Sequence, residues 1–232
     1  MSLLELESVG KRYGRLDRRI VLRDVSLSVD AGEVVVIWGM RRSGRSTLLR
    51  IAAGIETPDT GTVRFDGLDL RARPGATLGD GIGYCRRTFA DREGRLLLDQ
   101  LAGGLIGRGV AMTVAARRAH ESLERAGIGS CARCRPQELD GSDAVCATIA
   151  RALTLSPRLL IIDEPTIGVD LLARDRVLTL LHSLAQDGVA ILATTGESTS
   201  LSGARALTLS EGELHGPPAR ELGKLVALSP TG

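Results

Sequence analysis

Apolar and polar positions alternate at the start of the chain. Residues 3–13 and 20–29 each show this period of two, which is typical of strands with one buried face. A turn at 31–33 then leads into VVVIW at 34–38, and an unbroken apolar run of this kind indicates a strand buried on both faces. A shorter strand that ends in a turn is predicted at 61–67.

Farther along the chain, helical spacing of the apolar positions takes over. Helices are predicted at 46–53, 112–126, 141–155 and 171–185. Buried strands are predicted at 159–162 and 189–194, and the last strand at 204–209, before a turn at 211–212. Apolar strands that alternate with helices predict a parallel sheet covered on both faces.

The sequence predicts neither a transmembrane helix nor a secretion signal. The apolar stretch 101–116 contains Arg108 and four glycines. No run reaches the roughly 18 apolar residues that a membrane-spanning helix needs. The first residues lack the charged-then-apolar order of a signal peptide. We therefore expect any membrane role to depend on a partner protein.

Composition narrows the class of protein. A chain of 232 residues, 43% hydrophobic and 25% charged, is in the range of a globular domain. Its net charge of +2 gives no electrostatic basis for nucleic-acid binding. Only Lys11 and Lys224 are lysines, so a general bias towards arginine is one explanation for an arginine in place of a lysine. Cys131 and Cys134 are spaced as CxxC, but no second pair completes a zinc site, and we interpret them as reduced thiols.

The segment after the buried run 34–38 has the pattern of a phosphate-binding loop. Residues 39–47 read GMRRSGRST, which has the spacing GxxxxGK[ST] with arginine at the lysine position. Glycines let such a loop wrap around a polyphosphate, while backbone N–H groups and the start of the next helix attract the anion. The predicted nucleotide-binding residues are Gly39, Arg42, Ser43, Gly44, Arg45, Ser46 and Thr47.

Further segments, in order along the chain, resemble the motifs of one family. LDGSD at 139–143, followed by IARAL at 149–153, is similar to the LSGGQ signature and its helix. LLIIDEPT at 159–166 resembles a Walker B strand with its adjacent glutamate, and GVD at 168–170 resembles a D-loop. From about Leu3 to Gly212 the chain thus resembles the nucleotide-binding subunits of ABC-type transporters.

The resemblance implies a fold and a domain organisation. The fold would be α/β, with a P-loop NTPase core built on a mixed, mostly parallel sheet, an N-terminal antiparallel β lobe and an inserted helical lobe. The chain would form a single ATP-binding domain, 1–232, with the core and β lobe at 1–85 and 156–232 and the helical lobe at 86–155.

The resemblance also implies partners and cofactors. Two such subunits, as a homodimer or as a heterodimer with a sister subunit, would sandwich two ATP molecules with Mg²⁺. They would act on a transmembrane permease, which would hold the chain on the cytoplasmic, inner face of the cell membrane. Nucleic acid is not an expected partner.

Single residues receive roles from the same resemblance. Glu164 would be the general base that activates water, Asp163 and Ser46 would hold Mg²⁺, and Tyr13 would stack on adenine. The residues that would face the ATP of the partner subunit are Asp140, Gly141, Ser142 and Asp143, and Asp170 would lie in the D-loop.

Four motifs depart from the family pattern. Arg45 stands at the Walker A lysine, Arg87 at the Q-loop glutamine, and Thr195 at the switch histidine. Arginine is a planar fork of different reach from lysine, so Arg45 can still hold phosphate, and drift towards arginine explains it equally well. Arg87 would place a fixed cation beside the metal, unless it turns into solvent.

The signature departs most from the pattern, because Asp140, Ser142 and Asp143 replace its serine, second glycine and glutamine. Two unit charges about 4 Å apart interact by about 4 kcal/mol at an effective dielectric constant of about 20, so these aspartates would repel a γ-phosphate. Arg151 and magnesium would soften the repulsion. Aspartate is also a favoured helix N-cap, so Asp140 can serve the fold at the same time.

The sequence leaves alternative functions open. The first is an energy-coupling subunit that binds ATP and drives a permease, and the second is a regulatory or scaffolding subunit that binds nucleotide without appreciable turnover. A soluble relative acting on ribosomes or DNA is less favoured, because such proteins carry two of these domains or a long coiled coil. The transported substrate and the direction of transport are not encoded in these motifs.

Overall fold

Two β-sheets organise the chain, and the computed structural model describes residues 2–14, 19–72, 81–86, 89, 94–196 and 203–216. The smaller sheet is antiparallel, with strand order β2-β1-β4-β5. Its strands are β1 (Ser2–Tyr13), β2 (Arg19–Asp30), β4 (Thr60–Phe65) and β5 (Leu68–Asp69). This sheet confirms the antiparallel β lobe predicted at the N-terminal side of the fold.

The larger sheet has six strands in the order β10-β9-β3-β8-β7-β6. Its neighbours pair in parallel, except that β10 is antiparallel to β9. The strands are β3 (Val34–Trp38), β6 (Ile82–Cys85), β7 (Leu159–Ile162), β8 (Ala190–Thr195), β9 (Arg205–Ser210) and β10 (Glu213–His215). The mixed, mostly parallel sheet that the family resemblance implies is therefore present.

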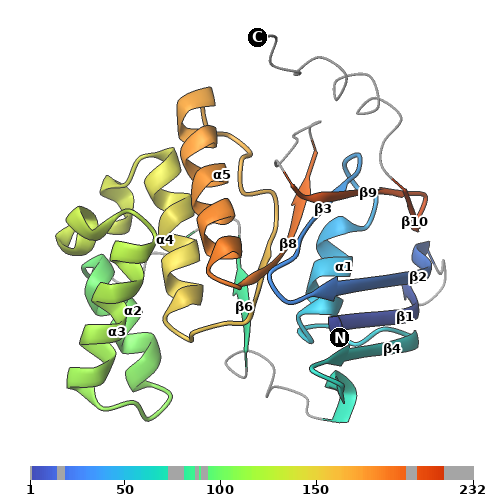
Figure 1. Cartoon of the computed structure of the whole chain (residues 1–232), viewed down its shortest axis with the longest axis horizontal. Coiled ribbons are helices and arrows are strands. Elements are labelled where there is room, and N and C mark those ends of the chain that lie inside the picture. Colours follow the sequence, from blue (N-terminus) through green and yellow to red (C-terminus); the bar gives the residue numbers. More distant parts are fainter. Residues whose placement is uncertain are drawn as a thin grey trace, which may run out of the picture.

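Four of the five α-helices, α2 to α5, gather on one side of the molecule, away from the antiparallel sheet (Figure 1). The α-helices are α1 (Arg45–Ala52), α2 (Leu97–Ile106), α3 (Met112–Arg125), α4 (Gly141–Leu153) and α5 (Leu171–Gln186). Short 3₁₀ helices occupy Leu70–Ala72, Gly129–Arg133 and Pro136–Glu138. Helices α2 to α4 lie together beside α5, whereas α1 lies on the other side of the large sheet, next to β1 and β2 (Figure 1).

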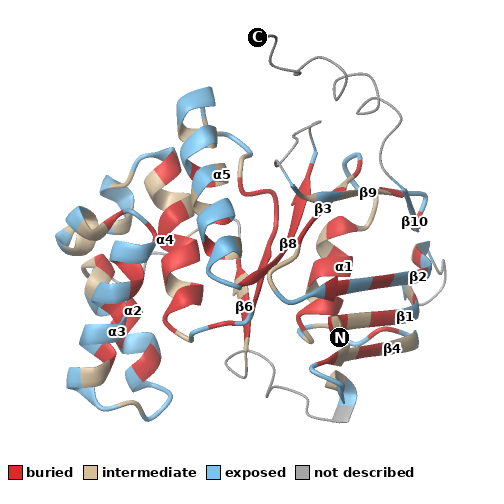
Figure 2. Cartoon of the chain, viewed as in Figure 1, coloured by how far each residue is buried: buried red, intermediate tan, exposed pale blue. Residues whose placement is uncertain are grey.

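Alternate residues of the central strands enter two separate hydrophobic clusters. In β3, Val34 and Val36 join the cluster formed with helices α2 to α5, while Val35 and Ile37 join the cluster formed with α1 and the small sheet. The same alternation runs through β7 and β8, and the buried positions of these strands and of α1 and α4 stand out in Figure 2. The prediction of a sheet buried on both faces is confirmed.

β6, α2 and β10 are among the elements that the pattern did not predict. β6 has only four residues, and its central Gly83 packs against Ala152 and Pro157 instead of contributing an apolar side chain. α2 contains Gly103 and Gly104, which weaken the helical signal. The prediction of 204–209 as the last strand was wrong, because the turn at 211–212 leads into β10, which pairs back onto β9.

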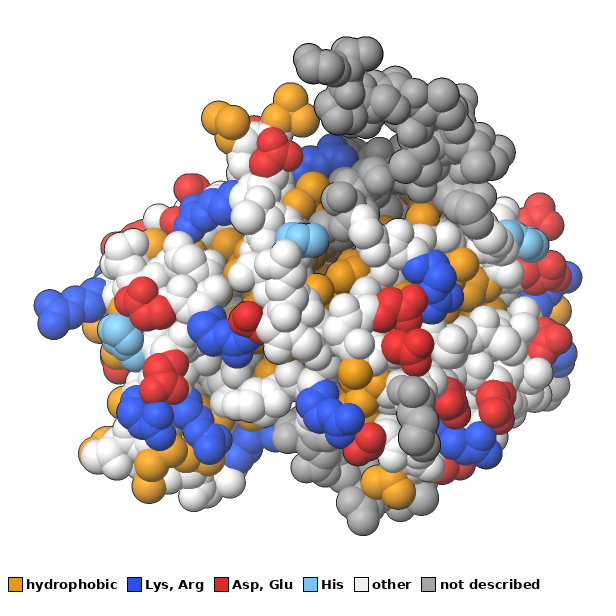
Figure 3. All heavy atoms as spheres, in the orientation of Figure 1, with side chains coloured by type: hydrophobic (Ala, Val, Ile, Leu, Met, Phe, Trp, Pro, Cys, Tyr) orange, Lys and Arg blue, Asp and Glu red, His pale blue; other side chains and the backbone are white. Residues whose placement is uncertain are grey.

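The surface mixes charges of both signs. On the face seen in Figure 3, acidic and basic side chains are interspersed, as the small net charge leads one to expect. Apolar atoms protrude at the first turn of α5, where Leu171 and Leu172 are 76% and 84% exposed. None of the helices in the described ranges is both long and apolar enough to cross a membrane.

Candidate functional site

Three strand ends meet at one edge of the large sheet. β3 ends at Trp38 and runs into the loop before α1, β7 ends directly before Asp163 and Glu164, and β8 ends at Thr195. These strands are parallel and adjacent, in the order β3-β8-β7, so their carboxyl ends share one edge. Ligands of open α/β sheets bind at the carboxyl ends of the strands. The residues predicted from the two Walker-like motifs are therefore brought together at this edge.

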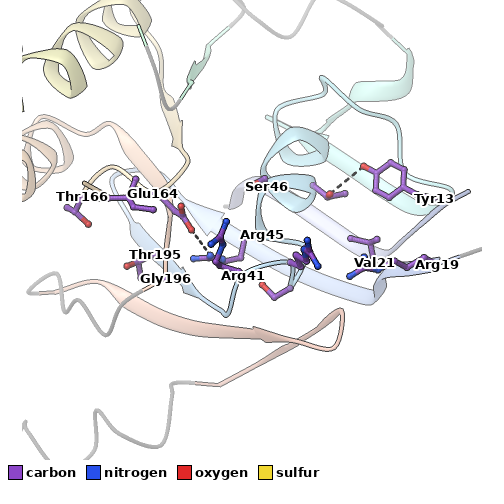
Figure 4. A pocket seen from close by; sticks show the side chains of 15 residues that line it. Tyr13, Arg19, Val21, Arg41, Arg45, Ser46, Glu164, Thr166, Thr195 and Gly196 are labelled. Carbon is purple, nitrogen blue, oxygen red and sulfur yellow. Dashed lines mark hydrogen bonds and ion pairs between the residues drawn. The ribbon is translucent and has the colours of Figure 1, made fainter. Parts of the chain in front are cut away.

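A pocket of about 680 Å³ lies between this edge and the β lobe. Tyr13 and Arg19 are at one end of it, and Glu164, Thr195 and Gly196 are at the other (Figure 4). The loop before α1 forms the wall between these ends. The full lining is Tyr13, Arg19, Val21, Arg41, Arg42, Ser43, Gly44, Arg45, Ser46, Thr47, Glu164, Thr166, Ile167, Thr195 and Gly196.

The backbone of the loop needs special conformations at two positions. Gly44 has φ 105°, and a Cβ atom there would lie 2.8 Å from the carbonyl oxygen of Val21, so only glycine fits. Arg42 has φ 67° although it carries a side chain. A left-handed conformation of a non-glycine residue costs about 1–2 kcal/mol. Strain of this kind concentrates at binding and catalytic sites, and Glu164 in the same pocket has φ 49°.

A buried ion pair joins the two Walker-like motifs. Arg45 Nη2 donates to Glu164 Oε1 at 2.5 Å, and each side chain is only 6% exposed. Gly196 lies against the pair, since a Cβ atom at this position would be 3.5 Å from Arg45 Nη1 and 3.6 Å from Glu164 Oε1. The arginine at the lysine position is therefore bound to the carboxylate that the resemblance assigns as general base.

Two polar atoms of the loop have no hydrogen-bond partner within the described part of the chain. They are Arg45 Nη1 and Ser43 Oγ, and both are buried. Buried polar groups in native proteins are nearly always hydrogen-bonded, so an orphaned pair in a pocket wall indicates groups that a ligand can satisfy. Both atoms are donors suited to the oxygen of an anion.

The metal-side residues form a short chain of hydrogen bonds. Ser46 Oγ donates to Asp163 Oδ2 at 2.7 Å, and Thr194 Oγ1 donates to Asp163 Oδ1 at 2.7 Å. The backbone N–H of Glu164 donates to Thr194 Oγ1 at 3.1 Å. A serine hydroxyl beside a carboxylate is a donor set that Mg²⁺ prefers, so these residues fit a magnesium ion. Thr194 was not identified from the sequence, because it lies inside a strand that reads simply as buried.

The backbone of Thr195, at the switch position, is hydrogen-bonded to the phosphate loop. Its carbonyl oxygen accepts a hydrogen bond from the N–H of Gly39 at 3.3 Å, which links the end of β8 to the start of the phosphate loop. The residue is 6% exposed and lines the pocket. A substitution that moved this backbone would therefore move the loop as well.

A network of polar side chains fixes Tyr13 at the far end of the pocket. Its hydroxyl donates to Glu56 Oε1 at 2.5 Å and accepts from Arg50 Nη2 at 3.2 Å. Lys11 Nζ lies 5.6 Å from the ring centroid. Burial raises the pKa of Glu56, but hydrogen bonds from Tyr13 and Arg50 outweigh it and lower the pKa below its ordinary value. The ring is thus held by a charged partner, next to the pocket.

The family model described as ABC transporter matches residues 22–167, which include the phosphate loop, the strand β7 and its two acids. The chain belongs to the ABC transporter family. The chain is similar to an uncharacterised ABC transporter ATP-binding protein of Mycobacterium tuberculosis, with 32% identity over 181 residues. That match covers 76% of the chain but 55% of the relative, so the chain spans about half the length of this relative.

Other relatives and solved structures match over more of their length. The taurine import ATP-binding protein of Pseudomonas aeruginosa is 34% identical over 227 residues, which cover 97% of this chain and 83% of that protein. An ATP-binding cassette solved as a dimer in a post-hydrolysis state, bound to ADP and Pi, superposes with a TM-score of 0.81 at 26% identity. The superposition covers 91% of this chain and 96% of that one, so the expected fold is confirmed.

The signature residues of this family member lie at the start of α4. Asp140 is the N-cap: its Oδ1 accepts from the N–H of Asp143 at 2.7 Å and from Ser142 Oγ at 2.9 Å. Gly141 is the first residue of the helix. The expectation that Asp140 serves the fold as a cap is confirmed. Its carboxylate thus accepts from the N–H of Asp143, one of the backbone donors that make a helix start attractive to anions.

The negative charge of Asp143 is compensated by a residue of α5 that the sequence analysis did not identify. Arg176, on α5, donates to Asp143 Oδ1 at 2.7 Å and to Ser142 Oγ at 3.3 Å. Arg151 was expected to soften the charge of the aspartates; its guanidinium lies 4.9 Å from the ring centroid of Phe89. The repulsion expected from two aspartates is therefore reduced at Asp143, and Arg176 is the cation that reduces it.

The remaining predicted residues are accounted for as follows. Asp170 is the N-cap of α5, where its Oδ1 accepts from the N–H of Ala173 at 2.8 Å. Arg87, at the Q-loop position, lies outside the described residues.

Asp140 should give α4 a pH-dependent stability. Hydrogen bonds from the N–H of Asp143 and from Ser142 lower the pKa of Asp140 below the ordinary 3.8. A depressed carboxyl pKa stabilises the fold above pH 3.8, and this stabilisation is lost as the pH falls through the folded pKa. We expect Asp140→Asn, which keeps the capping oxygen but not the charge, to be less stable than wild type by about 0.5 kcal/mol near neutral pH.

The measurement is the free energy of unfolding in urea for both proteins at several pH values. The difference between them should stay constant from neutral pH down to about pH 5 and shrink below pH 3.8. A difference that grew on acidification would contradict the assignment. Asp30→Asn, at the exposed end of β2, controls for loss of a charge away from α4.

Proposed function

We propose that this chain is the ATP-binding subunit of an ABC transporter, which couples ATP binding, with slow hydrolysis, to a membrane permease. The observation that carries the proposal is one continuous pocket with Tyr13 at one end and the Arg45–Glu164 pair at the other, walled by the phosphate loop (Figure 4). An aromatic ring, a phosphate loop and a carboxylate in this order suit the base, the phosphates and the hydrolytic end of a nucleotide.

Different residues bind different parts of the nucleotide along this pocket. Tyr13 stacks on adenine, and the N–H groups of the loop 39–44, at the start of α1, hold the phosphates. Ser46 and Asp163 hold Mg²⁺, which, when bound, supplies positive charge to the phosphate oxygens. Ser43 Oγ and Arg45 Nη1, the two orphaned donors, receive their partners from the same phosphates.

Hydrolysis depends on the state of the Arg45–Glu164 pair. In the reaction, the Glu164 carboxylate accepts a proton from the water that attacks the γ-phosphorus, while the bond between γ-phosphorus and the β-phosphate oxygen breaks. Without nucleotide, Arg45 occupies Glu164 Oε1. A terminal phosphate offers Arg45 a bidentate partner, so ATP competes for the guanidinium and releases the carboxylate. Each turnover must include this exchange of partners, which supports slow hydrolysis.

The same ion pair favours a second candidate, a regulatory or scaffolding subunit that binds nucleotide but does not hydrolyse it appreciably. If Arg45 holds Glu164 Oε1 in the nucleotide-bound state as well, that oxygen is not available to accept the proton. Binding alone can still close a dimer, because closure needs differential contact with the ligand and not its hydrolysis. Such a subunit would work beside an intact sister ATPase.

The partners follow from the first candidate. We propose that the chain pairs with a copy of itself or with a sister subunit, with each pocket facing the start of the partner's α4. A permease would hold the pair at the inner face of the cell membrane, through the helical lobe at 86–155. The relatives include a protein named for taurine import, but the pocket described here contacts nucleotide and not cargo, so the transported substrate follows from the permease.

Steady-state phosphate release, measured with the permease and its membrane present, tests the first candidate against the second. We expect wild type to release phosphate slowly but clearly above Glu164→Gln, because that substitution removes the group that accepts the proton. Glu164→Gln should bind ATP at least as tightly as wild type, as measured in parallel by calorimetry, because it lacks the carboxylate charge that competes with ATP for Arg45. Equal release from both, with binding intact, would reject slow turnover and leave the regulatory candidate.

A further inference from the structure

We infer that Cys131 and Cys134 form a redox site, at which a soluble disulfide such as oxidised glutathione converts the two thiols into a disulfide within the chain. The oxidation state of this site is coupled to Asp143, near the start of α4, because Cys131 is hydrogen-bonded to that carboxylate in the reduced form. Neither cysteine is among the residues that line the nucleotide pocket, so this redox site does not depend on the proposed function.

The backbone holds the two cysteines at a spacing that suits a disulfide. Cys131 lies in the 3₁₀ helix Gly129–Arg133, and Cys134 is the C-cap of this helix. The N–H of Cys134 donates to the carbonyl oxygen of Cys131 at 2.9 Å. A turn closed in this way keeps its first and fourth Cα atoms within about 7 Å, and side chains three residues apart in a 3₁₀ helix lie on the same side. Disulfides join Cα atoms about 4.4–6.8 Å apart, so the turn permits the bond.

Hydrogen bonds to the rest of the helical lobe anchor this turn at both ends. The N–H of Cys131 donates to the carbonyl oxygen of Ile128 at 2.9 Å, and the carbonyl oxygen of Cys134 accepts from the N–H of Leu97 at 2.9 Å. Leu97 is the first residue of α2. The fold therefore sets the spacing of the two thiols before any oxidation occurs.

Exposure distinguishes this pair from the other two cysteines of the chain. All four cysteines are free thiols, but Cys85 and Cys146 are buried, whereas Cys131 and Cys134 are partly exposed. Burial raises the pKa of Cys85 to about 12 and the pKa of Cys146 to about 11. The thiolate is the form that exchanges with a disulfide, so the two buried cysteines are inert towards a soluble oxidant.

The reduced pair is linked to the start of α4 through Asp143. Cys131 Sγ donates to Asp143 Oδ2 at 3.5 Å, while Arg176 Nη1 donates to the other oxygen of this carboxylate at 2.7 Å. Burial first, and then the negative charge of Asp143, raise the pKa of the Cys131 thiol, which keeps the donated proton in place. A disulfide has no S–H group, so oxidation removes this hydrogen bond from Asp143. The carboxylate therefore stabilises the reduced form of the pair.

The exchange balances with oxidised glutathione as the oxidant. Because Cys131 is bonded to Asp143, the thiolate of Cys134 attacks first: it joins one sulfur of the oxidant, whose S–S bond breaks, and one glutathione thiolate leaves. Cys131 then loses its proton to solvent and attacks Cys134 Sγ, and the second glutathione thiolate leaves. Two electrons pass to glutathione, and two protons end on its two thiols. Arg133 and Arg135, exposed on either side of Cys134, attract this anionic oxidant.

The test is a redox titration of the full-length chain in buffers that contain defined ratios of reduced to oxidised glutathione. Free thiols are then alkylated, and disulfides are mapped by mass spectrometry of peptides. We expect one disulfide per chain, between Cys131 and Cys134, which disappears again in excess reduced glutathione. Cys134→Ser should form no disulfide within the chain, whereas Cys146→Ala should form the same disulfide as wild type. Circular dichroism establishes that each variant is folded.

The variant Asp143→Asn tests the coupling to α4. It should raise the equilibrium constant for oxidation about fivefold, because the reduced form loses a hydrogen bond from a weak donor to a charged acceptor. Asp140→Asn is the matched control, since it removes the same charge from the same helix start, and the hydrogen bonds of Asp140 come from Ser142 and the N–H of Asp143. This control should change the equilibrium constant by less than about twofold.

Three results would overturn the inference. The first is a chain that forms no disulfide even in oxidised glutathione alone, and the second is a disulfide that maps to Cys146 or joins two chains. The third is an equilibrium constant for Asp143→Asn that is no higher than that of the Asp140→Asn control, which removes the coupling. Nucleotide takes no part in these measurements, so their failure leaves the proposed function intact, and a chain that failed to bind ATP would still form this disulfide.

Discussion

Arg45→Met should lower the free energy of unfolding by about 3 kcal/mol in the absence of nucleotide, because it removes the cation from a carboxylate that is 6% exposed. Methionine keeps most of the aliphatic stem, so the change reports the charge and not a large cavity. Removal of one partner of a buried ion pair is strongly destabilising, since the other charge keeps its desolvation cost. The quantity to measure is the urea midpoint with its slope.

A double-mutant cycle makes this prediction specific. Glu164→Gln removes the carboxylate charge alone, and Arg45→Met with Glu164→Gln removes both charges. We expect the double variant to recover most of the loss, to within about 1 kcal/mol of wild type, because no isolated buried charge remains. Strict additivity of the two single changes would show that Arg45 and Glu164 do not stabilise each other, contrary to their contact.

Arg45→Lys combined with Asp140→Ser should raise phosphate release from the complete transporter by about tenfold to a hundredfold. Lysine presents a compact ammonium, which leaves Glu164 more readily than a planar fork does when phosphate arrives. Serine is as good an N-cap as aspartate, so α4 keeps its first turn while it loses a negative charge that would face the partner's ATP in the proposed sandwich. The two changes therefore act on the phosphate loop of this chain and on the start of α4, which would face the ATP of the partner in the proposed sandwich.

Controls decide whether the gain arises at this site. Glu164→Gln on the improved background should abolish the added release, because the same carboxylate must accept the proton. Asp140→Ser alone should lower the free energy of unfolding by no more than about 0.5 kcal/mol, as expected for Asp140→Asn, because both keep a capping oxygen and lose the charge. If the combined variant released phosphate no faster than wild type, the substituted positions would not be the cause of slow turnover, and the ion pair would lose its proposed role.

The pattern of the sequence predicted the elements that long-range packing reinforces. The strands β3, β7 and β8 lie at the centre of the sheet, where burial on both faces makes nearly every position apolar, up to the two threonines that end β8. β6 was not predicted, because a strand of four residues with a central glycine presents too few apolar positions. α2 was missed although Leu97, Leu101 and Leu105 recur at helical spacing, because a pair of glycines interrupts the propensity.

The motifs located the site but not its side-chain pairing. The order of the phosphate loop and the two acids placed Ser46 and Asp163 correctly as neighbours. The contact between Arg45 and Glu164 spans 119 residues and depends on the reach of an arginine, for which the motif gives no rule. Arg176 was not identified from the sequence, because nothing in α5 alone shows that this residue contacts the start of α4.

The cap on α4 has a consequence for how ATP concentration would be sensed. The Asp140 carboxylate binds the N–H of Asp143 within the same turn, so it is a tethered competitor for the anion site at the start of that helix. A group tethered by so few bonds acts at an effective concentration that is fixed by geometry and does not fall when nucleotide does. A partner's terminal phosphate must displace this internal anion before it can dock. Closure of the proposed sandwich should therefore need more ATP than occupancy of the pocket does, which makes binding and closing two separate thresholds.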